Sequence, residues 1–411
     1  GSWPRAFGPN SQCVAVKGSN GEGKALGRAF VRATPMTGAE VVEMPSAPGA
    51  GSGAIAVPVI DISPFLAAEA LALGATACSG GGSLPEAALD VARRWRQAFA
   101  CQGFVQIVGH AVPDAAIEET YGAARRFFSL SAADKQQCDL GLGYIAKGYA
   151  TQGMERVSAT GSLPDGSDML GTEKARPPDR LESFVIRNRS ADEMPGGLDG
   201  FRETVFGYYD EMARLLRSVL RLTACSLDLP MDYFDEKHFR EEIEGLRCSG
   251  DCALKLAFYP RLEEGETPPP GQLRYGEHTD YNGFTLLWQD HNTCGPQTAK
   301  SDLKPPQGGL QVQLPTGEWI DCPPVPGAFV VNAGDLIQAW TNDVFLANPH
   351  RVLMPPPGEA HDRISLAFFT GPKSDVVVEA LPTCCGPDRP PRYSPITPDE
   401  HVARKLAASN K

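Results

Sequence analysis

The second half of the chain is divided into short apolar segments with turn residues between them, and this division limits the folds open to it. Most of the segments contain β-branched or aromatic side chains, which is typical of β-strands. Several short strands at such spacing favour a sandwich or barrel, here a core of the jelly-roll kind. The segments are ALKLAFYP (253–260), FTLLWQD (284–290), GLQVQL (309–314), AFVVNAGDLIQAWT (328–341), HRVLMP (350–355) and RISLAFFTG (363–371).

The first half of the chain has a different pattern, because its apolar residues recur at helical spacing. Residues 84–101, 113–130 and 200–227 predict helices, the last being the strongest. Residues 54–66 and 104–110 are apolar runs that predict strands, the first ending at a Ser-Pro breaker. We therefore expect an α+β chain, mainly β in its core, in which N-terminal helices support the core.

The charge balance argues against several classes of partner. The chain has 38 basic and 50 acidic residues, a net charge of −12, so nucleic acid and anionic membranes are repelled on average. No stretch reaches the roughly 18 to 20 consecutive apolar residues of a membrane span. We expect a soluble protein that binds a small molecule, with no nucleic acid, no membrane and no obligate protein partner.

Residues 1–54 and the cysteines give indications of where in the cell the protein is located. Residues 1–54 are rich in Gly, Ala, Ser and Pro without an apolar period, which predicts a disordered leader or the remnant of a targeting segment. The eleven cysteines are odd in number and scattered, which indicates reduced thiols in an intracellular protein. We expect a cytoplasmic location, with a plastid or mitochondrion as the alternative.

A candidate metal site comes from two histidines and one aspartate. His278 and Asp280 lie two positions apart between strand-like segments, and on an extended backbone such residues project to the same face. His350 begins a later segment and supplies the third ligand. Two imidazoles and one carboxylate leave other metal positions open, which suits iron(II) that must bind a co-substrate and oxygen together. The His-x-Asp pair alone is weak evidence, because it occurs often by chance.

A candidate carboxylate anchor lies on another segment. Arg363 and Ser365 are two positions apart and share a face of the predicted strand. A guanidinium can hold a carboxylate through two parallel hydrogen bonds, and a neighbouring hydroxyl adds another. Tyr259 in a preceding strand can supply a further hydroxyl. The three residues predict a binding site for an anionic co-substrate.

The order of these motifs resembles the isopenicillin N synthase-like branch of the 2-oxoglutarate and iron(II)-dependent dioxygenases, from about residue 56 to about residue 407. The motifs are VPVIDISPF (57–65), GFVQIVGH (103–110), LESF (181–184), FYP (258–260), HTDYNGFTLLWQD (278–290), GGLQV (308–312), NAGDLIQAWTND (332–343), NPHRV (348–352) and RISLAFF (363–369). The resemblance implies a distorted double-stranded β-helix (jelly roll), iron(II), 2-oxoglutarate and oxygen, with ascorbate as an optional reductant. The implied iron ligands are His278, Asp280 and His350. The implied 2-oxoglutarate residues are Arg363, Ser365 and Tyr259.

The chain departs from the family pattern at two places. Relatives often have an Asn two positions before the tyrosine of FYP, where this chain has Ala257, and residues 291–307 form an insertion, which we interpret as a surface loop in preference to a lid. The predicted organisation is a mostly helical N-terminal region over 55–245 and a catalytic jelly-roll region over 246–411.

The residues that meet the substrate are harder to derive. Phe369 shares a face with Ser365. Lys255 shares one with Tyr259 and could contact a substrate carboxylate, but we favour the alternative that it is a solvated strand lysine. The full set of candidate substrate residues is Phe369, Lys255, Tyr281, Phe284 and Arg187.

The expected reaction is oxidation of an unactivated C–H bond of a small organic molecule, by hydroxylation, desaturation or cyclisation, with release of succinate and carbon dioxide. One alternative is a relative that takes its electrons from the substrate or from ascorbate instead of 2-oxoglutarate. A zinc-dependent hydrolase with the same ligands and a non-catalytic jelly-roll binding protein are more remote alternatives.

Overall fold

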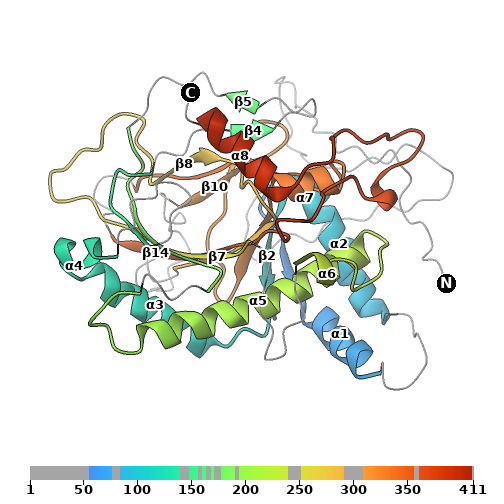
Figure 1. Cartoon of the computed structure of the whole chain (residues 1–411), viewed down its shortest axis with the longest axis horizontal. Coiled ribbons are helices and arrows are strands. Elements are labelled where there is room, and N and C mark those ends of the chain that lie inside the picture. The colour runs from blue at the N-terminus through green and yellow to red at the C-terminus, as the bar shows by residue number, and fades with distance from the viewer. Residues whose placement is uncertain are drawn as a thin grey trace, which may run out of the picture.

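The computed structural model describes residues 55–75, 84–138, 148–155, 160–162, 168–170, 177–189, 194–238, 251–290, 309–355 and 361–409. Two β-sheets form a jelly roll, and most of the helices lie along one side of it (Figure 1). The helices are α1 (Ser63–Ala75), α2 (Glu86–Gln102), α3 (Asp114–Phe128), α4 (Ala132–Gln136), α5 (Phe201–Ser226), α6 (Asp235–His238), α7 (Asp335–Trp340) and α8 (Pro398–Ser409), with a 3-10 turn at Pro382–Cys384.

The larger sheet has eight strands in the order β1-β2-β12-β9-β14-β7-β6-β3, and the smaller sheet has four in the order β11-β10-β13-β8. Among the described residues, the only parallel strand pair in these two sheets joins β1 and β2. The strands are β1 (Val59–Asp61), β2 (Phe104–Val108), β3 (Gly148–Ala150), β6 (Glu182–Arg187), β7 (Ala253–Tyr259), β8 (Tyr275–His278), β9 (Phe284–Gln289), β10 (Leu310–Gln313), β11 (Trp319–Asp321), β12 (Phe329–Ala333), β13 (His350–Val352) and β14 (Arg363–Phe369); β4 (Thr160–Ser162) and β5 (Asp168–Leu170) form a separate hairpin.

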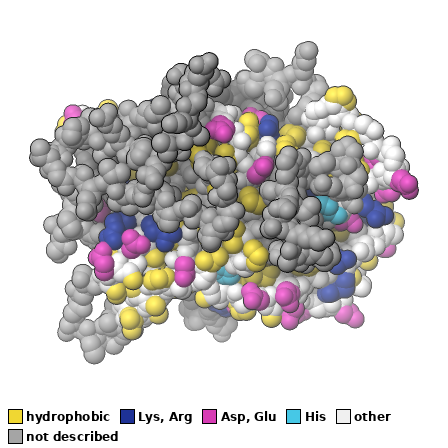
Figure 2. Space-filling model, turned by 180° about the vertical axis from the view of Figure 1, so that it is seen from behind, with side chains coloured by type: hydrophobic (Ala, Val, Ile, Leu, Met, Phe, Trp, Pro, Cys, Tyr) yellow, Lys and Arg dark blue, Asp and Glu magenta, His cyan; other side chains and the backbone are white. Residues whose placement is uncertain are grey.

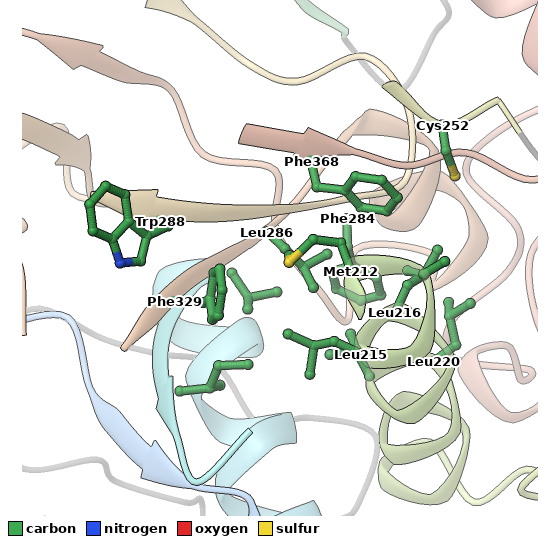
Figure 3. Close-up of a cluster of buried hydrophobic side chains, with 14 of the residues drawn as sticks. Met212, Leu215, Leu216, Leu220, Cys252, Phe284, Leu286, Trp288, Phe329 and Phe368 are labelled. Carbon is green, nitrogen blue, oxygen red and sulfur yellow. The ribbon is translucent and has the colours of Figure 1, made fainter. Parts of the chain in front are cut away.

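The main hydrophobic core lies between the large sheet and its helices. In Figure 3, Met212 and Leu216 of α5 lie beneath Leu286 of β9 and Phe368 of β14, and all four are buried. Complete burial of one such side chain contributes roughly 1.5–3 kcal/mol. The apolar face of α5 therefore fixes the outer face of the large sheet.

A second, smaller core lies between the two sheets. Phe104 of β2 and Val330 of β12 contact Val312 of β10 and Val352 of β13 in one buried cluster. Successive residues of a strand point to opposite faces. On β14, Ile364, Leu366 and Phe368 face the helices, whereas Arg363 and Ser365 face the space between the sheets. The polar side chains of the candidate site are thus directed inward.

Two predicted boundaries need correction. The strand predicted over residues 54–66 is too long, because β1 ends at Asp61 and α1 begins at Ser63. The Asp61 carboxylate accepts a hydrogen bond from the main-chain N–H of Ser63, and Pro64 lies in the first turn of the helix, where its missing N–H costs nothing. The Ser-Pro pair therefore starts a helix in addition to ending a strand.

The second correction concerns the run over 328–341. It is a strand only to Ala333, after which α7 begins at Asp335 with Gly334 at its N-cap. The predicted run is therefore a strand joined directly to a helix.

The N-terminal region contributes strands as well as helices, since β1, β2, β3 and β6 all belong to the large sheet. Of these, β3 and β6 were missed as strands, as were β8 and β11 in the catalytic half. The division of the chain into two regions at residue 245 remains a prediction. The large sheet contains strands from both regions. The predicted leader over 1–54 and the insertion over 291–307 lie outside the described residues.

The described surface seen in Figure 2 has basic and acidic side chains beside one another, without separation into patches of one sign. Among the described helices, none combines the length and apolar character that a membrane crossing requires.

Candidate active site

The three predicted metal ligands meet between the two sheets. His278 ends β8, Asp280 follows two residues later, and His350 begins β13. One ligating atom from each lies within 4.8 Å of the others, and all three residues are buried. Nε2 of His278 is 3.5 Å from Oδ1 of Asp280, and Nε2 of His350 is 3.8 Å from Oδ2. This spacing leaves room for one ion held by all three groups.

Strand pairing brings the two histidines together. In the antiparallel pair of β13 and β8, His350 lies opposite His278 and Val352 lies opposite Tyr275, so β8 has one residue more between these pairs. Such a bulge lets Tyr275 and His278 face the same side, and their rings are 4.8 Å apart. Phe104 packs against His350 from the large sheet, at 5.3 Å between ring centroids. The imidazoles are held between aromatic rings.

Both imidazoles are oriented by main-chain carbonyls. Nδ1 of His278 lies 2.8 Å from the carbonyl oxygen of Gly276, and Nδ1 of His350 lies 3.3 Å from that of Asn348. A carbonyl can only accept, so Nδ1 is the donor in each of these contacts and Nε2 is the ring atom placed to bind a metal. Burial, with a smaller contribution from His278, lowers the pKa of His350 to about 4, which keeps that ring neutral near pH 7.

Two buried side chains orient the carboxylate. Thr285 of β9 and Asn332 of β12 each donate a hydrogen bond of 2.6 Å to Oδ2 of Asp280. Burial acts to raise the pKa of Asp280, but His350, His278 and the Thr285 hydroxyl outweigh it and hold that pKa well below its usual range. The carboxylate is therefore ionised and fixed before any metal binds.

The loop that carries Asp280 rests on the start of α7. Main-chain N–H groups of Gly334 and Asp335 donate to the carbonyls of Gly283 and Asp280, both at 2.8 Å. A Cβ at Gly334 would lie 2.6 Å from the carbonyl oxygen of Asn282, which is closer than packing allows. The glycine of the NAGD motif therefore allows the loop to approach the helix closely.

The predicted carboxylate anchor lies on the large sheet. Arg363 of β14 pairs with Tyr259 of β7, Ser365 lies opposite Gln289 of β9, and all four residues are buried. Nη2 of Arg363 donates to Oε1 of Gln289 at 3.1 Å, and its guanidinium carbon is 4.8 Å from the centre of the Tyr259 ring. Nη1 of Arg363 is buried without a hydrogen-bond partner among the described residues. An unpaired N–H on a buried cation fits an anionic ligand.

The candidate substrate residues have different surroundings. The solvated-lysine alternative for Lys255 is wrong, because this side chain is 8% exposed and forms an ion pair with Glu155. Phe284 lies in the core on the helix side of β9, with its ring centroid 5.4 Å from that of Phe99. The next residue, Thr285, faces the opposite way and contacts Asp280. Phe284 is therefore placed away from Asp280.

The other three candidates lie around the metal loop and the end of β14. Arg187 forms an ion pair with Asp251 at the end of β6. The ring of Tyr281 lies 5.6 Å from Nζ of Lys405 on α8, so the C-terminal helix packs beside the metal loop. Phe369 ends β14 opposite Thr285 and is partly buried.

Three polar residues near the site were not singled out from the sequence: Thr285, Asn332 and Gln289. Thr285 and Gln289 lie on the same face of FTLLWQD, and two polar residues on one face of an otherwise apolar strand were the signal that could have found them. For Asn332 the sequence offers no such signal, because the hydrogen bond to Asp280 crosses from another strand.

Comparison with known proteins agrees with this geometry. Residues 250–372 match the model of the 2OG-Fe(II) oxygenase superfamily, and residues 57–189 match that of the N-terminal region of non-haem dioxygenases in morphine synthesis. The 2-oxoglutarate-Fe(II) type oxidoreductase ppzC of Metarhizium majus is 30% identical over 370 residues, which cover 85% of this chain and 86% of the relative. The chain belongs to the 2OG-Fe(II) oxygenase superfamily. Clavatol oxidase claD of Penicillium crustosum is also 30% identical, over 86% of this chain and 96% of its own.

Solved structures of this superfamily share the fold. A full-length Neurospora crassa protein in complex with alpha-KG, which is 2-oxoglutarate, is 29% identical and has a TM-score of 0.66 over 86% of this chain and 96% of its own. This member of the superfamily is accordingly an oxidoreductase with a jelly-roll core that uses Fe(II) and 2-oxoglutarate. The donor set fits Fe(II), since two neutral imidazoles and one carboxylate leave positions for exchangeable ligands.

Proposed function

We propose that this enzyme oxidises an unactivated C–H bond of a small organic molecule, using Fe(II) on His278, Asp280 and His350. The observation that supports the proposal most directly is the buried cluster of these three ligands, whose donor atoms lie within 4.8 Å of one another. At such a centre Fe(II) would let O2 act as the oxidant: one oxygen atom would enter succinate as 2-oxoglutarate loses carbon dioxide, and the other would provide the two-electron oxidation of the C–H bond.

The chain's own residues position the reactants. Arg363, with Ser365 and Tyr259 beside it, is proposed to bind the distal carboxylate of 2-oxoglutarate, which would fill the unpaired Nη1 position. Burial of all the ligands excludes water from the centre and strengthens each electrostatic contact there. The protein thus contributes orientation and a dry environment.

The substrate class follows from relatives and from the side chains around the centre. One relative is named for the oxidation of clavatol, and a Neurospora crassa structure, 28% identical with a TM-score of 0.66, contains alpha-KG and thymine. Both molecules are small and cyclic. We propose a small organic substrate that contacts Phe369 and Tyr281, with Lys255 and Arg187 as polar neighbours.

A second candidate function is an iron oxidase that does not consume 2-oxoglutarate. A Dictyostelium discoideum relative named as a probable iron/ascorbate oxidoreductase is 30% identical over 66% of this chain and 72% of its own. The unpaired nitrogen of Arg363 favours the 2-oxoglutarate-dependent reaction, because it calls for an anion at that position in the large sheet.

The test is a screen of small metabolites with Fe(II), 2-oxoglutarate and oxygen, in which succinate is measured beside the oxidised product. We expect one succinate for each product molecule. Product without succinate would support the second candidate, and neither product nor succinate across a broad screen would count against both.

A further inference from the structure

Arg274 is a buried arginine beside the proposed 2-oxoglutarate anchor. It immediately precedes β8 and is 1% exposed. Its Nη2 donates to the main-chain oxygen of His361 at 2.7 Å, and its own main-chain N–H donates to Val352 at 3.0 Å. His361 stands two residues before Arg363, so the Arg274 guanidinium reaches the start of β14, close to the Arg363 side chain. The two arginines come from opposite sheets.

Neither guanidinium is fully paired. Nε of Arg274 and Nη1 of Arg363 are both buried without a hydrogen-bond partner among the described residues. The remaining contacts of these side chains are with neutral groups: a main-chain carbonyl for Arg274, and the Gln289 amide and Tyr259 ring for Arg363. Burying a cationic N–H without a hydrogen-bond partner is unfavourable, so an anionic ligand that completes both guanidinium groups would be favoured at this position.

Arg274 has two further charged neighbours besides Arg363. Arg180 also lies near Arg274 and is paired with Glu266, at 2.9 Å between Nη2 and Oε2. Asp362 lies near as well, and its carboxylate accepts the main-chain N–H of Arg261. Burial and the charge of Arg363 lower the pKa of Arg274 to about 10, so Arg274 still carries its proton near pH 7.

We propose that Arg274 is a second guanidinium for the distal carboxylate of 2-oxoglutarate, which it holds together with Arg363. The inference rests on the proposed binding of 2-oxoglutarate at Arg363. Two cations from opposite sheets make the site select strongly for a 2-oxo acid with a distal negative charge. Arg274 is a binding residue in this arrangement, in addition to linking β8 to the residues before β14.

The test compares two ligands on Fe(II)-loaded protein without oxygen, where no turnover occurs. Calorimetry measures the Kd of 2-oxoglutarate and that of 2-oxopentanoate, which has the same chain length and a methyl group in place of the distal carboxylate. Arg274→Gln removes the charge but keeps an amide that can donate to His361. We expect the Kd of 2-oxoglutarate to rise about 10-fold or more and that of 2-oxopentanoate to stay unchanged.

Two further variants keep the test decisive. Arg274→Lys retains the charge and serves if the glutamine variant does not fold; its Kd for 2-oxoglutarate should lie between those of wild type and Arg274→Gln. Arg180→Gln removes a neighbouring guanidinium that Glu266 already balances, and it should leave the preference for 2-oxoglutarate intact.

The outcomes separate this inference from the proposed function. If the wild type prefers 2-oxoglutarate and both Arg274 variants keep that preference, Arg274 has only a structural role and the inference is overturned. Equal weakening of both ligands leads to the same conclusion. If the Fe(II)-loaded wild type binds no 2-oxoglutarate, the co-substrate site at Arg363 is itself wrong, and the inference fails with it.

Discussion

The interior of the jelly roll has two chemically different ends. At the metal end, each ligand has a partner that fixes it: main-chain carbonyls orient His278 and His350, and two hydrogen bonds hold Asp280. At the arginine end, Arg274 and Arg363 have buried N–H groups without partners among the described residues. The protein alone organises the three candidate metal ligands, whereas we propose that a bound ligand completes the arginine end. Substitutions at the metal end should therefore lower the affinity for Fe(II), and those at the arginine end should lower the affinity for 2-oxoglutarate.

The largest effect is expected from loss of a metal ligand. His278→Ala should weaken Fe(II) binding by more than about 100-fold, because loss of a group that merely orients a ligand already costs about 10- to 100-fold. Anaerobic titration with Fe(II) measures it. His361→Ala is the control, since that residue contributes its main-chain oxygen to Arg274 and lies outside the ligand cluster. Equal metal affinity of wild type and His278→Ala would refute the ligand assignment.

At the other end, Arg363→Gln should affect 2-oxoglutarate and spare the metal. Loss of charge-assisted hydrogen bonds, each worth about 1.5–3 kcal/mol, should raise the Kd of 2-oxoglutarate by about 10- to 150-fold. Fe(II) affinity should stay within about 2-fold. A variant that loses Fe(II) and 2-oxoglutarate binding together would show that the two ends are not independent.

Thr285→Val tests the orientation of the metal end. It removes one of the two hydrogen bonds to Asp280 at nearly constant volume and should weaken Fe(II) binding about 10-fold. Thr370→Val is the matched control, because the Thr370 hydroxyl also makes one buried hydrogen bond, 2.7 Å to the carbonyl of Phe284. If both variants lose Fe(II) affinity equally, the effect comes from general destabilisation.

The smallest effect should come from Ser365→Ala. A single neutral hydrogen bond contributes about 0.5–1.5 kcal/mol, so the Kd of 2-oxoglutarate should rise about 3- to 10-fold with Fe(II) affinity unchanged. Ser183→Ala removes a hydroxyl that donates to Glu155 and should leave that Kd unchanged. An unaltered Kd in Ser365→Ala would remove this hydroxyl from the proposed anchor.

The two ends also differ in how far sequence predicts them. The ligands at the metal end lie in a compact motif and at a strand start, and strand alternation is enough to bring His278 and Asp280 to one face. That His350 lies opposite His278 depends on the pairing of β13 with β8, which was not predicted because β8 is short and partly polar.

Residues that act across strands were the ones missed. Asn332 reaches Asp280 from β12, and Arg274 reaches the start of β14 from the other sheet. Their roles depend on which strands are neighbours in space, and periodicity within one segment does not contain that information. Phe284 was a wrong choice within a correctly predicted strand. Its neighbour Thr285 is the residue that contacts Asp280, and Phe284 faces the helices.

The most direct test of the two-ended site is the Kd of 2-oxoglutarate measured without oxygen, in the presence and absence of Fe(II). If one molecule spans both ends, Fe(II) should tighten binding in the wild type. In Asp280→Ala that tightening should disappear, while the metal-free affinity, which depends on the arginine end, stays the same. An identical Kd with and without Fe(II) in the wild type would contradict the shared site.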